Sequence, residues 1–175
     1  KGPGGGIVFM TPSTPGNTSG LFYEAAPSTW HSSSGDPESV WCNNATDVLG
    51  VASAVAGTGA MDGAAKTTVM LGVCTTGAAN LADAYTVPVN GVVYGDWFLP
   101  SKNELNVMYS VLGTASPGIG SYARSFYWSS SEYDFNNAWT VNFKDGQQFD
   151  REKWLLPDTI NGVKALRVRA IRAFG

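Results

Sequence analysis

A short β-branched and aromatic run near the start of the chain, and apolar residues that alternate with polar ones near its end, predict β-strands at both ends. The apolar segment 6–11 and the segment 21–26 flank the turn-forming residues 15–17, so the two segments predict an N-terminal hairpin. The last segment, 166–174, alternates up to Ala170 and then changes parity. This change indicates a bulge, or a strand that is covered on both sides near its end.

A helix is predicted between these ends, starting at Ser101. Ser101 can cap the N-terminus while Glu104, three residues later, bonds back to the cap amide, which is a capping box. Gly113 stands at the usual position for a helix stop. The apolar residues that recur at helical spacing between them are Leu105, Met108, Tyr109 and Leu112.

Two shorter helices are expected over 62–71 and 78–85, although Gly63 weakens the first of them. Before them lies a loop over 27–44, which is rich in Ser, Gly and Pro but carries two tryptophans that we expect to pin it to the body. These are Trp30 and Trp41. The residues expected to face inward in the first short helix are Met61, Ala65, Val69 and Met70.

Alternation of period two returns in 126–130 and 139–143, which predicts two more strands. A hairpin should join the second of them to a following strand through a three-residue loop, 144–146, with Gly146 left-handed. This register is preferred because it puts Phe149 on the same face as the other apolar residues. The expected buried face consists of Trp139, Val141, Phe143 and Phe149. The expected polar face consists of Thr140, Asn142, Gln148 and Asp150.

Strands at both ends and helices between them predict an α+β domain in which the N- and C-terminal strands pair. We expect mixed and antiparallel sheets, two main helices and long loops. A length of 175 residues, 43% of them hydrophobic and 14% charged, suits one folded domain over 1–175. Residues 1–6 are interpreted as a flexible linker, and the chain as a piece of a longer protein.

A net charge of −3 argues against binding to nucleic acid or anionic membranes, which relies on clustered Lys and Arg. Arg167, Arg169 and Arg172 lie close together in sequence, but in a strand-like segment where they need not form a patch. No apolar run approaches the roughly 18 residues needed to span a bilayer, so no membrane insertion is expected.

Two cysteines, Cys42 and Cys74, permit one disulfide, which suits an oxidising extracellular compartment. We expect the disulfide; the alternative is two unpaired thiols that simply pack. No structural metal site is expected, because two cysteines and the distant His31 lack ligand spacing.

No catalytic constellation stands out, and no enzyme is expected. His31 would have to serve any Ser-His-Asp triad, but no nucleophile-elbow motif surrounds a serine. A calcium site could use Glu132, Asp134, Asn136 and Asn137, whose oxygens suit a hard cation; the alternative is a solvated turn. The carboxylate pairs Glu132 with Asp134 and Asp150 with Glu152 are ordinary on exposed hairpins.

Several ordered motifs together resemble one family, the Lcl C-terminal domain family, named for the C-terminal domain of a bacterial collagen-like adhesin. They are Gly4-Gly5-Gly6-Ile7-Val8-Phe9, Glu24-Ala25-Ala26-Pro27, Asp96-Trp97-Phe98-Leu99-Pro100-Ser101 with Glu104-Leu105, Tyr127-Trp128-Ser129-Ser130-Ser131-Glu132, Ala138-Trp139 and Val168-Arg169-Ala170-Ile171-Arg172-Ala173-Phe174.

This resemblance covers nearly the whole chain and implies a C-type-lectin-like fold. It implies a terminal module of a bacterial surface protein, adhesin or phage tail protein, located on the cell surface or virion and associated as a homotrimer. The adhesin's sulfated glycosaminoglycan ligand fits poorly with the acidic balance of this chain. The same fold serves variable proteins of diversity-generating retroelements and also formylglycine-generating enzymes, although neither cysteine lies in a motif of the latter.

The favoured hypothesis is a non-catalytic module that binds a cell-surface glycan or protein receptor. Its expected site consists of Tyr133, Asp134, Asn136, Asn137, Asn142, Gln148, Asp150, Arg151 and Lys153. The alternatives are a structural module that caps or trimerises a fibre and, more remotely, an enzyme on the formylglycine-generating scaffold.

Overall fold

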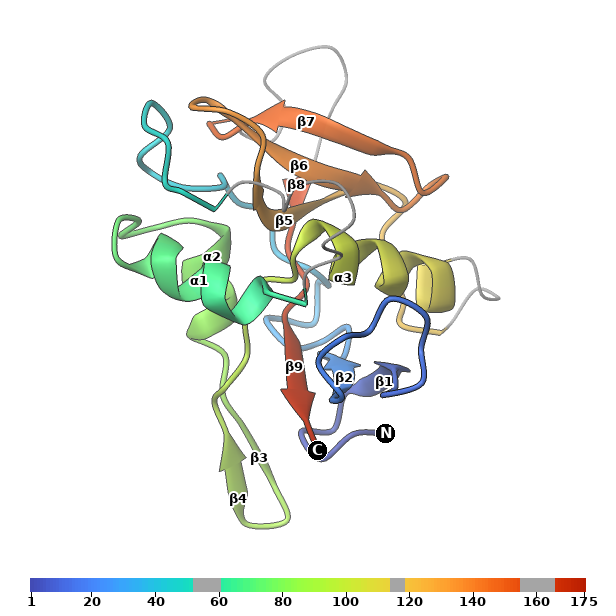
Figure 1. The fold of residues 1–175 in the computed structure, drawn as a ribbon. Coiled ribbons are helices and arrows are strands. Elements are labelled where there is room, and N and C mark those ends of the chain that lie inside the picture. Colours follow the sequence, from blue (N-terminus) through green and yellow to red (C-terminus); the bar gives the residue numbers. More distant parts are fainter. Residues whose placement is uncertain (52–60, 114–118, 155–165) are drawn as a thin grey trace.

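A computed structural model describes residues 1–51, 61–113, 119–154 and 166–175, and it is of the α+β class (Figure 1). Strands β1 (Ile7–Met10), β2 (Phe22–Ala25) and β9 (Ile171–Phe174) form an antiparallel sheet in the order β1-β2-β9. The N-terminal hairpin and the pairing of terminal strands are therefore confirmed.

A second sheet has the order β7-β6-β5-β8. Its strands are β5 (Phe126–Glu132), β6 (Asn137–Asn142), β7 (Gln148–Glu152) and β8 (Leu166–Arg167). Only β8 runs parallel to its neighbour, β5. The change of parity in the C-terminal segment has a topological cause, because the chain leaves this sheet after β8 and enters the terminal sheet as β9.

Helix α3 (Lys102–Met108) lies between the two sheets and continues as a π-helical turn, η1 (Tyr109–Gly113) (Figure 1). Its capping box is confirmed: the Ser101 hydroxyl accepts from the Glu104 amide at 3.3 Å, and the Glu104 carboxylate accepts from the Ser101 amide at 2.7 Å.

Helices α1 (Gly63–Leu71) and α2 (Ala78–Asp83) appear where two short helices are predicted, so the described residues hold three α-helices rather than two main ones. The predicted inner face of α1 is wrong at Ala65 and Val69, which are exposed, whereas Met70 is buried and Met61 packs partly buried against the core. Val69 is 45% exposed, and the residues that turn inward are Gly63, Lys66, Thr67 and Met70. Polar contacts decide the orientation, since the Lys66 ammonium donates to the Ser131 hydroxyl at 3.1 Å.

One hairpin was not expected from the sequence. It joins β3 (Val87–Val89) to β4 (Val92–Tyr94) and projects from the body beside the terminal sheet (Figure 1). Asn90 and Gly91 at its turn have φ values of 49° and 82°. Positive φ at both central residues is the geometry of a type I′ turn, for which Asn-Gly is a strongly preferred pair.

The predicted register of the β6–β7 hairpin is wrong by one residue. Gly146 is left-handed, with φ of 81°, but the Asn142 carbonyl accepts from the amides of both Asp145 and Gly146, so the loop has four residues, 143–146. Phe149 therefore pairs with Thr140 and lies on the face opposite Val141 and Trp139.

Burial of both faces of this sheet explains the error. On one face, Tyr127 and Val141 pack with α3; on the other, Trp128 packs with Trp41 and the loop that precedes α1. An aromatic residue is thus accommodated on either side. Phe149 contacts Phe126, with ring centroids 5.9 Å apart.

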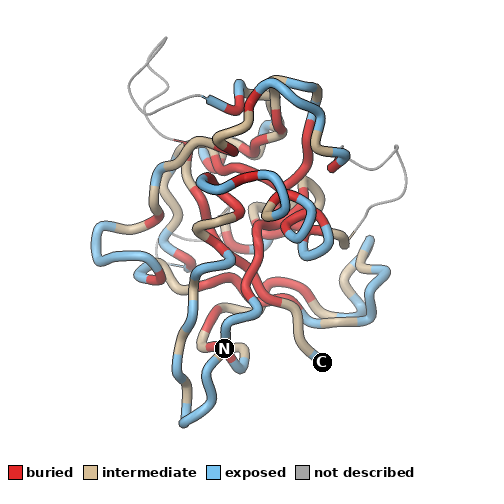
Figure 2. Tube along the Cα trace, turned by 90° about the vertical axis from the view of Figure 1, so that its left-hand side faces the viewer, coloured by how far each residue is buried: buried red, intermediate tan, exposed pale blue. Residues whose placement is uncertain are grey.

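The long loop 27–44 is pinned by its two tryptophans, as predicted. The indole NH of Trp41 donates to the Ser129 carbonyl at 2.7 Å, and the Trp30 ring packs edge-on against Tyr85 with centroids 5.4 Å apart. The disulfide between Cys42 and Cys74 is also present, and it ties this loop to the end of α1. Buried residues run through the middle of the molecule, and exposed residues occupy the outer loops (Figure 2).

Residues 2–6, expected as part of a flexible linker, form a turn that is bonded to the body. The amide of Gly2 donates to the Gly6 carbonyl at 3.0 Å, and the amides of Gly4 and Gly6 donate to the Glu24 carboxylate at 2.9 Å each. In the described part of the chain, no helix is long and apolar enough to cross a membrane.

Candidate functional site

Two buried carboxylates hold arginines of the C-terminal segment. Glu24 accepts from the Arg172 guanidinium at 3.0 Å, and Arg172 also contacts Asp96. Asp36 accepts from the guanidinium of Arg169, with both side chains at most 1% exposed. The charges of these arginines are neutralised inside the fold, which agrees with the expectation that they form no basic patch.

Lys153 is a third cation whose charge is neutralised inside the fold, and its burial corrects the predicted site. Its side chain is 0% exposed, and its ammonium donates to the Glu132 carboxylate at 2.6 Å, the Phe135 carbonyl at 2.9 Å and the Asp47 carbonyl at 3.0 Å. All three ammonium hydrogens therefore have acceptors inside the protein. Lys153 cannot contact a ligand directly; it joins three segments of the chain.

Glu132 completes this junction by accepting from the amides of Leu49 and Gly50 at 2.9 Å and 3.2 Å. The carboxylate is 1% exposed and lies between two backbone amides and an ammonium. Asp134, the other acid of the suggested calcium site, accepts from the Asn137 amide at 2.8 Å and the Asn136 amide at 3.0 Å. Both acids are thus engaged in holding the local chain.

Desolvation opposes the ionisation of Asp134, but hydrogen bonds from Asn137 and Asn136 outweigh it and lower the pKa of this carboxyl. Among the described residues, no three acidic, histidine or cysteine side chains gather as a metal site. The structure therefore offers no support for calcium at this turn.

Around the Lys153 junction, four large apolar side chains face solvent. We call this group the aromatic tip; it consists of Val48, Tyr133, Phe135 and Trp154, which are 67%, 51%, 55% and 51% exposed. Val48 and Trp154 adjoin residues of the junction, and Phe135 itself accepts a bond from Lys153. The loop before β6, the end of β7 and the segment near Val48 lie on the side away from both chain ends (Figure 1).

Sequence reasoning included Tyr133 but missed the other three residues of the tip. Phe135 stands in a polar turn, and Trp154 follows a run of polar residues. For Phe135 and Trp154, an aromatic residue next to a run of polar residues was the signal that could have identified them, whereas Val48 carried no such signal.

Beside the tip, one face of β6–β7 carries a partly exposed tryptophan, which we call the Trp139 face. Asp150 lies directly across from Trp139, while Gln148 and Glu152 follow on the same side of β7. The Lys102 ammonium lies 3.4 Å from the centroid of the Trp139 ring, a cation–π contact, and burial lowers the pKa of this lysine. The ring of Tyr133 meets Trp139 edge-on at 5.1 Å.

The opposite face holds two other predicted residues. Arg151 stacks on the rings of Phe126 and Phe149, at 4.5 Å and 4.9 Å from their centroids. Asn142 accepts from the Lys144 amide at 3.0 Å and so fixes the hairpin loop.

The nine predicted site residues therefore do not form one surface. Tyr133 belongs to the tip. Gln148, Asp150 and Asn137 lie on the Trp139 face, and Asp134 and Asn136 shape the adjoining turn. Asn142 and Arg151 lie on the other side of the sheet, and Lys153 is inside.

The assignment of Trp139 to the core is also wrong in detail, because this residue is half-buried.

No model of a known protein family matches the chain, and no curated protein matches it. The resemblance to the Lcl C-terminal domain family and the C-type-lectin-like fold remain predictions.

Proposed function

We propose that this domain is a non-catalytic recognition module of an exported surface or fibre protein, with a C-type-lectin-like fold. It binds a protein receptor on a cell surface through the aromatic tip, and the Trp139 face forms the polar border of the contact. The observation that carries the proposal is the exposure of four large apolar side chains around one buried lysine.

Exposed apolar side chains that gather in one place mark interaction sites, whereas scattered ones do not. Tyr and Trp are enriched in protein interfaces because a large ring buries much area with few rotatable bonds. Three of the four tip residues are aromatic. The Phe135 carbonyl accepts from Lys153, and the Leu49 amide next to Val48 donates to Glu132, so these two segments of the tip rest on a fixed support.

The border of the tip carries both charges. Asp150 and Glu152 on β7 face the same side as Trp139, and Lys102 covers part of its ring. An interface with an apolar centre and a polar rim of this kind is typical of protein–protein contacts. Charge at the rim influences association rate and selectivity more than affinity.

The test measures binding of the fluorescently labelled domain to a panel of bacterial and mammalian cells. The variant Tyr133→Ala/Phe135→Ala/Trp154→Ala should lose binding, and protease treatment of the cells should abolish it. The matched control, Val92→Ser/Val93→Ser, changes equally exposed residues on the β3–β4 hairpin and should bind as the unchanged domain does.

Equal binding by the triple variant would overturn the tip as the site. Binding that survives protease but is lost after glycosidase treatment would replace the protein receptor with a glycan. If no cell type binds the domain, the recognition function itself is contradicted. Circular dichroism of each variant verifies that the fold is retained.

The second candidate, a module that caps or trimerises a fibre, is favoured by the β3–β4 hairpin. Val92 and Val93 on it are 51% and 67% exposed, and residues 86–95 contain no charge. A two-stranded hairpin is marginal in water without packing against another surface. Light scattering that shows a stable trimer, which Val92→Ser/Val93→Ser dissociates, would support this candidate.

A further inference from the structure

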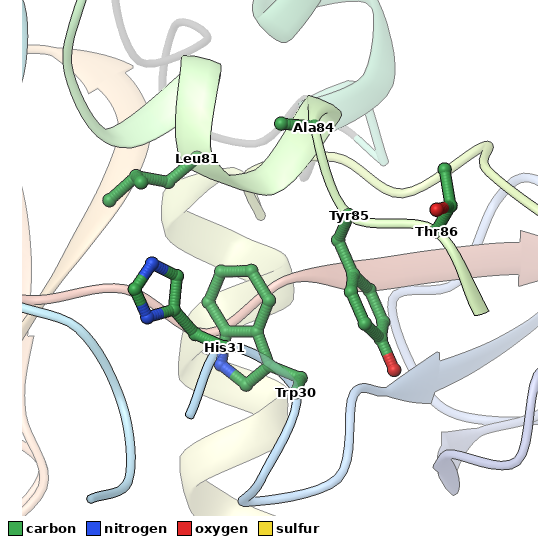
Figure 3. A pocket seen from close by; sticks show the side chains of 6 residues that line it. All are labelled: Trp30, His31, Leu81, Ala84, Tyr85 and Thr86. Carbon is green, nitrogen blue, oxygen red and sulfur yellow. The ribbon is translucent and has the colours of Figure 1, made fainter. Parts of the chain in front are cut away.

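A pocket of about 270 Å³ opens between the loop that follows β2 and the end of α2 (Figure 3). It lies apart from the elements that form the aromatic tip, and the proposed receptor function does not use it. Its lining consists of Trp30, His31, Leu81, Ala84, Tyr85 and Thr86.

The aromatic walls of the pocket are held from behind. The Trp30 indole is fixed by its bond to Asp36, and its ring meets Tyr85 edge-on at 5.4 Å. Tyr85 in turn packs against buried Trp97, with centroids 5.0 Å apart. A pocket whose rings are fixed in this way is formed before a ligand arrives, which reduces the entropy lost on binding.

The lining combines apolar surface with neutral polar groups. Trp30, Leu81 and Ala84 supply rings or aliphatic surface, while the hydroxyls of Tyr85 and Thr86 can donate and accept hydrogen bonds. Within the described part of the chain, neither hydroxyl makes a hydrogen bond. His31 adds an exposed imidazole, which also offers both a donor and an acceptor.

The lining holds no lysine, arginine, aspartate or glutamate. Acidic sugars, sulfate groups and phosphates require cationic partners, so they do not fit this chemistry. A neutral sugar fits it, because one face of a pyranose ring presents C–H groups to an aromatic wall while its hydroxyls need neutral donors and acceptors. The volume lies just below the usual range for drug-sized ligands and suits a single ring.

We propose that this pocket binds one neutral pyranose unit, such as a terminal hexose or N-acetylhexosamine of a glycan. A ligand this small should bind with a dissociation constant of about 1 mM, given ordinary ligand efficiency. The site is therefore suited to additive, multivalent contact rather than to tight capture.

The test titrates the isotope-labelled domain with galactose, glucose, mannose and N-acetylglucosamine, and follows the amide and indole signals by NMR. At least one sugar should shift the signals of Trp30 and His31 in a saturable manner. N-acetylneuraminic acid, as the anionic comparison, should not.

Two variants separate the pocket from other causes. Ala84→Trp places a large ring at an exposed rim position and should abolish the shifts, whereas Tyr85→Phe keeps the ring but removes the hydroxyl and should weaken binding by roughly tenfold. The control Tyr133→Ala alters the tip and should leave sugar binding unchanged, so failure of the receptor proposal and failure of this one remain distinguishable.

The absence of saturable shifts with any neutral sugar would overturn the proposal, as would full binding by Ala84→Trp. Preferential binding of N-acetylneuraminic acid, or of indole used as a small aromatic probe, would also overturn it, because the pocket would then select charge or an aromatic ring.

Discussion

Removal of the Lys153 ammonium is predicted to destabilise the domain strongly, although this residue does not face a ligand. The substitution Lys153→Met keeps the length of the side chain and removes its charge. It leaves the Glu132 carboxylate buried without a cation, together with two backbone carbonyls that lose their donor.

The geometry sets the size of the expected effect. At 2.6 Å and an effective dielectric constant of about 20, the Coulomb attraction of this pair is about 6 kcal/mol before the cost of desolvation is subtracted. Breaking a buried pair by removing one partner costs about 3–5 kcal/mol. We therefore expect Lys153→Met to lower the free energy of unfolding by about 4 kcal/mol.

The assay is urea unfolding followed by tryptophan fluorescence with the disulfide intact. The Trp41 ring lies 4.9 Å from the Lys153 ammonium and provides a local reporter. The control is Glu38→Gln, which breaks the ion pair with Arg167, whose side chains are 35% and 24% exposed; it should cost less than about 1 kcal/mol.

A double-mutant cycle with Glu132→Gln shows whether the two residues are coupled. The combined variant should be less destabilised than the sum of the two single variants, because each single change leaves the other group unpaired. If Lys153→Met costs no more than Glu38→Gln, the junction does not support the aromatic tip in the way we infer.

Burial raises the pKa of the Glu104 carboxyl from 4.5 to about 7, so between these pH values the folded domain retains a proton that the unfolded chain releases. The free energy of unfolding should therefore fall by about 3 kcal/mol as the pH rises from about 4.5 through 7. Glu104→Gln should remove this pH dependence, which thermal melts across this pH range would measure. Loss of the disulfide in Cys42→Ser/Cys74→Ser, whose residues are 32 apart, should cost about 4 kcal/mol in urea unfolding. Gly63→Ala would place a Cβ atom 2.1 Å from the Glu104 carboxylate and should destabilise by about 2 kcal/mol, whereas an unchanged melting temperature would contradict this close packing. Gly91→Ala, at φ of 82°, should cost about 1 kcal/mol by the same measurement.

Several features that the sequence predicted correctly depend on residues close to one another along the chain, whereas the disulfide and the pairing of the terminal strands join distant residues and were predicted from the cysteine count and from the strand patterns at both ends. The capping box at Ser101 and Glu104 needs only a spacing of three, and the left-handed Gly146 needs only a turn. The Asn90-Gly91 turn is equally local, but it was not among the predicted features. It was missed because Pro88 and the short flanking runs did not suggest strands, although the pair itself is a strong hairpin signal.

The features that could not be predicted depend on distant parts of the chain. Phe149 can lie on the face opposite Val141 only because both faces of the sheet are covered. The loop around Trp41, which covers this second face, lies about a hundred residues earlier in the chain. Lys153 stands among polar residues and is typical of an exposed strand. Its burial follows from acceptors that the fold brings next to it, among them the Asp47 carbonyl and the Glu132 carboxylate.

Buried charge and exposed aromatic rings at the tip are two consequences of one arrangement. Four large apolar side chains of the segments that meet there point outward, although Leu49 and Val51 pack against the core, so apolar burial alone holds the tip only weakly. A lysine with three acceptors and a glutamate with two amide donors supply directional bonds in place of that burial. The charged residues Lys153 and Glu132, whose type suggests contact with a ligand, therefore support the tip from inside. The apolar residues of the aromatic tip, whose type suggests a place in the core, form the surface available to a partner.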